Sequence, residues 1–126
     1  MTTRIMTEQQ AQNVNALVLA YVGDAVQSLY VRSKLAFEHD CKAHDMHKMA
    51  SDEVNAHAQA LQAKEIFPLL TQEEKDVYMR ARNAKTRHRA KNRTLSDYKK
   101  ATAVEAVLGY LYLTGKTDRL KTLLEV

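Results

Sequence analysis

Two acidic side chains stand alone in long apolar segments of the sequence. Asp24 is the only formally charged residue between positions 16 and 31. Glu105 is likewise the only formally charged residue between positions 101 and 115. If the two carboxylates came within about 4 Å of each other, they would repel by roughly 4 kcal/mol at an effective dielectric near 20. They would then share a proton or a divalent cation, and a site with two oxygen ligands and several water positions suits Mg²⁺.

The residues alone leave other interpretations of both acids open. Asp24 follows Gly23 and could cap a new helix that begins at Ala25. Glu105 could bind an arginine of the basic stretch between positions 80 and 100. Helices that are apolar over most of their circumference are usually buried, and a buried carboxylate is costly without a cation or hydrogen bonds. The spacing does not show that the two acids meet.

A basic segment lies between positions 80 and 100. It holds nine cations and one acid, a net charge of +8, so the rest of the chain carries −4. This concentration favours a polyanion site over a merely solvated face, and binding should weaken steeply as salt rises. Few aromatic residues lie nearby, which disfavours a reader of single strands, whereas double-stranded RNA needs no stacking platform. The cations are Arg80, Arg82, Lys85, Arg87, Arg89, Lys91, Arg93, Lys99 and Lys100.

Histidines and tyrosines offer weaker signals. The group His39, Cys41, His44 and His47 could be considered for zinc, but its spacing is irregular for a structural zinc site, and solvated histidines are the favoured interpretation. The tyrosines fall at helical spacing and indicate core positions; they are Tyr21, Tyr30, Tyr110 and Tyr112.

Gly23 and Gly109 each cost a helix about 1 kcal/mol. A glycine beside each acid therefore predicts close approach of another backbone at both places.

The elements that must position these residues are helices. With three glycines and one proline in 126 residues, the chain can hardly supply the turns of a β-sandwich or barrel. We expect one all-α domain over residues 1–126. The apolar spacing predicts helices over about 13–37 and 44–64. A third helix, capped by Thr71 with Glu74, should end near 84 and be followed by a loop over 85–93. A fourth, capped by Ser96 or Asp97, should end near 114–115, and Thr117 should cap the last one.

The cellular setting is also suggested by composition. The single cysteine excludes an internal disulfide and fits a reducing cytoplasm. The first ten residues have no apolar core of the secretory kind, and no uncharged apolar run reaches the roughly 18 residues that span a bilayer. We expect a cytoplasmic protein without a membrane partner.

Three segments resemble a known family. Residues 17–26, Leu-Val-Leu-Ala-Tyr-Val-Gly-Asp-Ala-Val, resemble the signature helix of the ribonuclease III catalytic domain. Residues 102–113 resemble its second acidic helix. Together with Arg-Ala-Arg-Asn-Ala-Lys at 80–85, they are most similar to the mini-ribonuclease III family, which has the catalytic domain without a double-stranded-RNA-binding domain. The resemblance covers about residues 13–124.

The resemblance implies a ribonuclease III-type fold and a hydrolase that cuts double-stranded RNA. Asp24 and Glu105 would be both the catalytic residues and the ligands of Mg²⁺, with Mn²⁺ as a substitute ion. The active unit would be a symmetric homodimer, with precursor large-subunit (23S) ribosomal RNA as substrate and a ribosomal protein as helper. The residues that position the RNA would be Arg80, Arg82, Asn83, Lys85, Arg87, Arg89, Lys91 and Arg93.

Two positions depart from the broader ribonuclease III pattern. Ala20 and Thr102 stand where that family carries acids, as they do in the mini family. The site is thereby reduced to two carboxylates. A catalytically silent RNA-binding or ribosome-assembly protein of the same fold is the main alternative, and a plain helical scaffold dimer is a second one.

Overall fold

The structure, a computed structural model, describes residues 4–40, 42–53, 56–85 and 94–126. Within these residues the chain is helical and contains no strand, as the all-α prediction requires. The helices are α1 (Glu8–Gln12), α2 (Ala16–Glu38), α3 (Ala43–Glu53), α4 (Ala56–Ile66), the short 3₁₀ helix η1 (Phe67–Leu69), α5 (Gln72–Arg82), α6 (Leu95–Leu113) and α7 (Thr117–Leu124).

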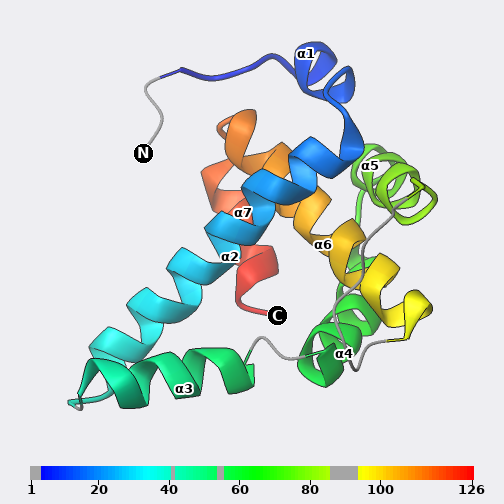
Figure 1. Cartoon of the computed structure of the whole chain (residues 1–126). Coiled ribbons are helices and arrows are strands. Elements are labelled where there is room, and N and C mark those ends of the chain that lie inside the picture. The colour runs from blue at the N-terminus through cyan, green and yellow to red at the C-terminus, as the bar shows by residue number, and fades with distance from the viewer. Residues whose placement is uncertain (1–3, 41, 54–55, 86–93) are drawn as a thin grey trace.

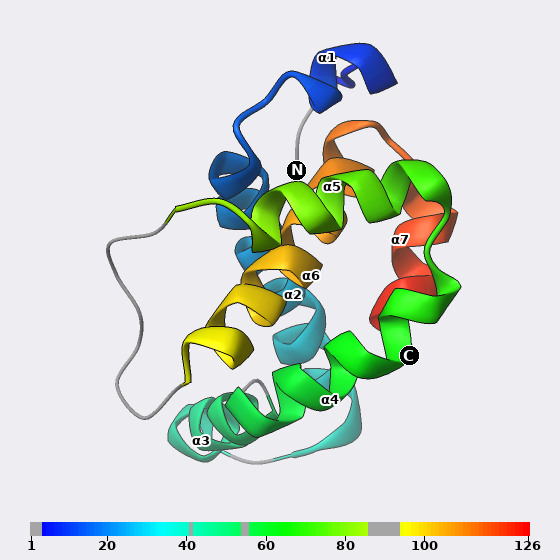
Figure 2. The ribbon, with the colours of Figure 1, turned by 90° about the vertical axis from the view of Figure 1, so that its right-hand side faces the viewer.

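Helix α6 forms the centre of the molecule. It is apolar on nearly all sides, and α2, α4, α5 and α7 pack around it (Figures 1 and 2). The largest side chains that it buries completely are Leu108, Tyr110 and Leu111. Because burying such side chains is worth about 1.5–3 kcal/mol each, the apolar circumference of α6 explains why this helix is central.

The segment predicted as one helix over 44–64 consists of two helices. Helix α3 lies against α2, whereas α4 lies against α6 (Figures 1 and 2). One straight helix could not follow both partners, so tertiary packing overrides the continuous apolar spacing. Helix α2 also begins later than predicted, at Ala16, where the Asn15 side chain accepts a 2.8 Å hydrogen bond from the backbone N–H of Leu17.

Helix caps agree with the sequence in one case and differ in two. Thr71 and Glu74 form the predicted capping box, with reciprocal hydrogen bonds of 3.2 and 2.9 Å. Helix α6 is capped by Thr94, whose hydroxyl accepts from the backbone N–H of Asp97, rather than by Ser96 or Asp97. Thr117 is the first residue of α7 and not its cap.

Glu74 also ties three elements together. Its buried carboxylate receives hydrogen bonds of 3.0 and 2.8 Å from the Arg119 guanidinium on α7, which in turn donates to the carbonyl of Leu69 in η1. Burial favours the neutral acid, but hydrogen bonds from Arg119 and from the Thr71 backbone outweigh it and hold the pKa of Glu74 below its ordinary value. The pair fixes α7 beside α5.

None of the helices within the described residues has the length and apolar character needed to cross a membrane.

Candidate active site

The two lone acids lie on helices that touch backbone to backbone. A methyl group on Gly23 would collide with the carbonyl oxygen of Glu105 and come within 2.9 Å of the Gly109 nitrogen. A methyl group on Gly109 would collide in the same way with the carbonyl of Leu19. The close approach predicted from the two glycines is therefore confirmed.

This contact relates the acids to each other. Asp24 is the chain neighbour of the glycine that rests on the Glu105 backbone. Residues more than 80 positions apart in the chain are thus brought together where α2 crosses α6. The interpretation of Asp24 as the cap of a new helix is wrong, because α2 runs without a break through this position.

The acids are more accessible than the sequence suggests. Asp24 is exposed and Glu105 is half-buried, although the apolar segments around them predicted burial. Tyr21, also expected in the core, is 81% exposed, whereas Tyr110 is fully buried. The reason is that α2 packs through one face only, so its apolar outer face remains in solvent. A metal ion and a phosphate can reach carboxylates in such a position.

The donor set fits Mg²⁺ better than a transition metal. The described residues contain no cluster of three His, Cys, Asp or Glu side chains that could hold an ion. Mg²⁺ requires only one or two carboxylates, because it keeps several waters and binds substrate phosphate. Asp24 and Glu105 are the residues that could supply such carboxylates.

The two positions that lack acids contribute no further carboxylate. Ala20 is buried in the core beside α6. Thr102 donates its hydroxyl proton to the carbonyl oxygen of Tyr98 at 2.9 Å, which leaves a neutral hydroxyl oxygen as its only acceptor. Neither can replace the charge of a missing acid.

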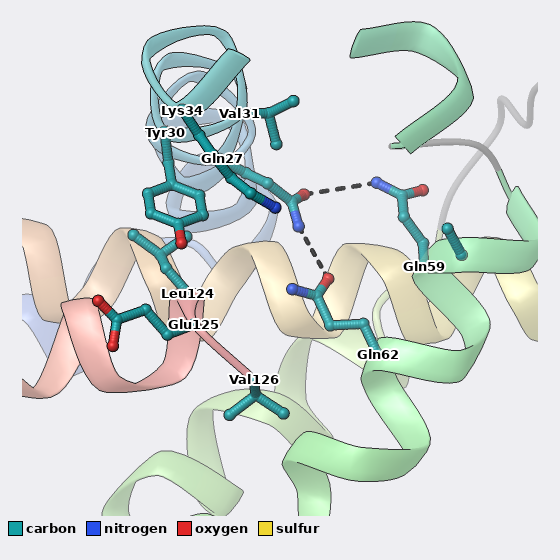
Figure 3. Close-up of a pocket in the computed structure, with 10 residues that line it drawn as sticks. Gln27, Tyr30, Val31, Lys34, Gln59, Gln62, Leu124, Glu125 and Val126 are labelled. Carbon is teal, nitrogen blue, oxygen red and sulfur yellow. Dashed lines mark hydrogen bonds between the residues drawn. The ribbon is translucent and has the colours of Figure 1, made fainter. Parts of the chain in front are cut away.

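Helix α2 is anchored one turn beyond Asp24 by a glutamine cluster that sequence reasoning missed. Gln27 is 6% exposed and donates to the Gln62 side chain at 2.8 Å, while Gln59 donates to Gln27 at 3.5 Å (Figure 3). The three amides lie beside a cavity of about 190 Å³ between α2, α4 and the end of the chain. Gln27, a polar residue within the apolar sequence of α2, was the signal from which a buried polar contact could have been predicted.

Four of the predicted RNA-contacting residues lie within the described part of the chain. Arg82, Asn83 and Lys85 are exposed at the end of α5. Arg80 is exposed too, but its guanidinium donates to the carbonyl of Gln12, so it ties α5 to the end of α1. The remaining predicted contacts lie outside the described residues; they are Arg87, Arg89, Lys91 and Arg93.

The zinc alternative gains no support from the described histidines. His39, His44 and His47 are exposed, and Cys41 lies outside the described residues.

Comparisons with known proteins agree with this architecture. Residues 17–116 match the family model described as the ribonuclease III domain. The mini-ribonuclease 3 of Thermoanaerobacter sp. (strain X514) is 42% identical over 124 residues, which cover 98% of this chain and 87% of that protein. The mini-ribonuclease 3 of Staphylococcus aureus (strain NCTC 8325 / PS 47) is 40% identical, covering 94% and 92%.

A solved structure shows the same fold. The crystal structure of a Fusobacterium nucleatum protein superposes with a TM-score of 0.79 at 34% identity, and the match covers 90% of each chain. The family resemblance of the three sequence segments is thus confirmed over nearly the whole chain. The chain belongs to the ribonuclease III family, in its mini-ribonuclease 3 branch, and is an endoribonuclease of the ribonuclease III type.

Proposed function

We propose that this chain hydrolyses phosphodiester bonds in double-stranded RNA, and that Asp24 and Glu105 hold the Mg²⁺ on which the reaction depends. The observation that supports the proposal is the contact of Gly23, the chain neighbour of Asp24, with the Glu105 backbone where α2 crosses α6. Both acids are accessible to an ion and a substrate.

The two acids are assigned to the metal ion, and the basic residues are assigned to the RNA backbone. Asp24 and Glu105 would hold the ion through their carboxylate oxygens. When bound there, magnesium would supply Lewis acidity for the activation of water and for offsetting charge on the phosphate. Arg82 and Lys85 bind phosphates and fix the duplex relative to the acids, and Asn83 adds an uncharged hydrogen-bonding group beside them.

A homodimer is part of the proposal. Helix α2 exposes an apolar face that includes Val18 (50% exposed), Tyr21 (81%) and Leu29 (52%). Tyr21 and Leu29 line a groove of about 530 Å³ that also includes Asp24 and apolar residues of α6 and α7. A second copy on this face would cover the apolar surface, and its two-fold axis would present one site to each strand of the duplex.

The cellular substrate is proposed from the family. We infer that the chain acts in the cytoplasm as a single catalytic domain on precursor 23S ribosomal RNA. A ribosomal protein helper would add to the selectivity of this domain. The support is membership of the mini-ribonuclease 3 branch.

The alternative predicted from the sequence, a catalytically silent RNA-binding protein, rests on two positions without acids, and membership of the mini-ribonuclease 3 branch weighs against it. Ala20 is buried, and the Thr102 hydroxyl donates to its own helix, so the site has two carboxylates rather than four. Such a protein would bind duplex RNA and cut nothing, with or without Mg²⁺.

The deciding experiment compares the wild type with Asp24→Asn and Glu105→Gln. Each protein is incubated with structured RNA, with and without Mg²⁺, and cleavage is followed on gels. We expect Mg²⁺-dependent cutting by the wild type and a loss of at least about 100-fold in each variant, because one of only two charged metal ligands is gone.

The control is Asp118→Asn, which removes an exposed acid on α7 and should leave cutting unchanged. Wild-type protein that binds duplex RNA without cutting it under any metal condition would establish the silent candidate. Full activity of Asp24→Asn would show that the proposed site is wrong.

A further inference from the structure

A second groove lies on a different part of the molecule from the two acids. It has a volume of about 620 Å³ and is bounded by α4, η1, α5 and the first half of α6. This volume is in the range of sites that take up a molecule the size of a nucleotide. Neither Asp24 nor Glu105 lines it.

The floor of the groove is apolar and partly aromatic. The rings of Phe67 and Tyr78 pack with their centroids 5.0 Å apart and their planes tilted by 56°. Tyr78 and Ala63 are almost fully buried, so the apolar surface that remains accessible comes from Phe67, Met79 and Leu61, the last 50% exposed. Such a floor suits a flat, apolar group.

The rim of the groove is cationic. Lys64 on α4, Arg82 on α5 and Lys100 on α6 line it, against one acid, Asp97. The Arg82 guanidinium is held beside the floor, since its Nη1 lies 3.9 Å from the sulfur of Met79. A ligand that combines a flat apolar part with a negative charge would match both surfaces.

We propose that this groove binds one unpaired nucleotide of the RNA substrate, with the base against the apolar floor and a phosphate on the cationic rim. The inference rests on the RNA binding of the proposed function and adds a source of selectivity to it. An extrahelical base or a base beside the end of a duplex enters a pocket at lower cost than a paired base, which must first lose its pairing and stacking.

The observations favour RNA over an acidic peptide as the occupant. Arg82 and Lys100 line this groove and also belong to the basic segment to which the proposed function assigns the duplex, so the groove and that segment share two cations. Three cations against one acid match a phosphodiester backbone that passes from the duplex into the groove. A nucleotide flanking the bound duplex would therefore reach this floor.

The test uses hairpin RNAs with one extrahelical position moved along the stem. At each position that site carries either an adenosine or an abasic residue, so backbone flexibility is equal and only the base differs. Dissociation constants are measured by fluorescence anisotropy without divalent metal. For the wild type, we expect at least one position where the adenosine RNA binds about fivefold to tenfold more tightly than its abasic partner.

Matched variants locate the base. Leu61→Glu places a negative charge in the groove wall and should abolish the preference for the base. Leu69→Glu makes the same change at a leucine of equal exposure (52% against 50%) that does not line the groove, and should preserve the preference. Circular dichroism checks that both variants fold. Preference that persists in Leu61→Glu would overturn the proposal.

Failure of this proposal differs from failure of the proposed function. Binding of the fully paired hairpin without base preference at any position overturns the groove and leaves the nuclease standing. No RNA binding at all overturns both. Amide shifts of groove residues on addition of an acidic, leucine-bearing peptide, with none on addition of adenosine monophosphate, would assign the groove to a protein partner instead.

Discussion

At the scale of single residues, two glycines decide how near the acids come. Gly23 and Gly109 are buried where α2 crosses α6, and any side chain at either position would meet backbone atoms of the opposite helix. Backbone atoms cannot swing aside as the end of a flexible side chain can. The absence of two Cβ atoms is thus what allows Asp24 and Glu105 to share one crossing.

Gly23→Ala tests this explanation. In an isolated helix the change would add about 1 kcal/mol of stability. Here we expect the free energy of unfolding to fall by about 2 kcal/mol, because the collision with the Glu105 carbonyl forces the helices apart. Chemical denaturation measures the change. Ser33→Ala, at an exposed position of the same helix, should stay within about 0.5 kcal/mol of the wild type. A more stable Gly23→Ala protein would contradict the role given to this contact.

At the scale of elements, polar side chains fix the angles between helices that apolar packing leaves loosely defined. Gln27 and its partners Gln59 and Gln62 join α2 to α4 beside the acids. Glu74 and Arg119 join α5 to α7 on the other side of α6. Both groups are hydrogen-bonded inside or at the edge of the core, where leaving one partner unpaired is expensive.

Replacing Glu74 by glutamine should weaken the junction of α5 with α7. Glutamine keeps the acceptor for the Thr71 N–H but removes the charge that Arg119 faces. We expect a loss of about 2 kcal/mol at neutral pH, below the 3–5 kcal/mol of a fully buried pair because the Arg119 side chain is 30% exposed. Urea denaturation measures it, and the exposed Glu65→Gln on α4 is the control.

The same pair predicts a pH dependence. Because the pKa of Glu74 is lowered on folding, the unfolded chain takes up the proton first as the solution is acidified. The stability that this carboxylate provides is therefore complete above its unfolded pKa, about 4.3–4.5, and is lost as pH falls through the lower folded pKa. Between these two pKa values, the free energy of unfolding of Glu74→Gln should fall less steeply with decreasing pH than that of the wild type. Parallel curves would show that the pair does not carry this dependence.

At the scale of the whole molecule, charge and apolar surface are separated. In the sequence, positions 80–100 carry +8 and the rest of the chain carries −4; of the cations that the structure describes, Arg82 lies at the end of α5 and Lys99 and Lys100 lie in the first half of α6. The exposed apolar side chains of α2 lie beside Asp24, away from the cationic groove. This division suits a protein that meets a second copy on one face and a polyanion on another.

Tyr21→Arg tests the face proposed for the dimer. An arginine there would be buried against its own copy across a two-fold axis, so we expect the protein to sediment as a monomer in analytical ultracentrifugation. Phe37→Arg is the matched control, since this aromatic residue is 92% exposed near the end of the same helix and does not line the α2 groove. A Tyr21→Arg protein that remains dimeric would exclude this face.

Much of the fold could be predicted because its signals are local. Continuous apolar spacing with few glycines and prolines specifies helices, and the Thr71–Glu74 box specifies where one of them starts. The break between α3 and α4 could not be predicted, since it depends on which helix each half packs against. The cap at Thr94 was missed because Thr94, Ser96 and Asp97 offer competing oxygens within one turn.

By itself, the sequence determined that the chain is helical, that two acids stand alone among apolar residues, and that positive charge is concentrated in one segment. The segments around Asp24 and Glu105 also showed the resemblance to the ribonuclease III family. Only the tertiary structure decided that the helices carrying these acids touch at one crossing, that Asp24 is exposed, and that Lys64, Arg82 and Lys100 line a common groove. The reason is physical: composition and periodicity act within a few turns of one helix, whereas a site is made of side chains that only packing between distant helices can bring together.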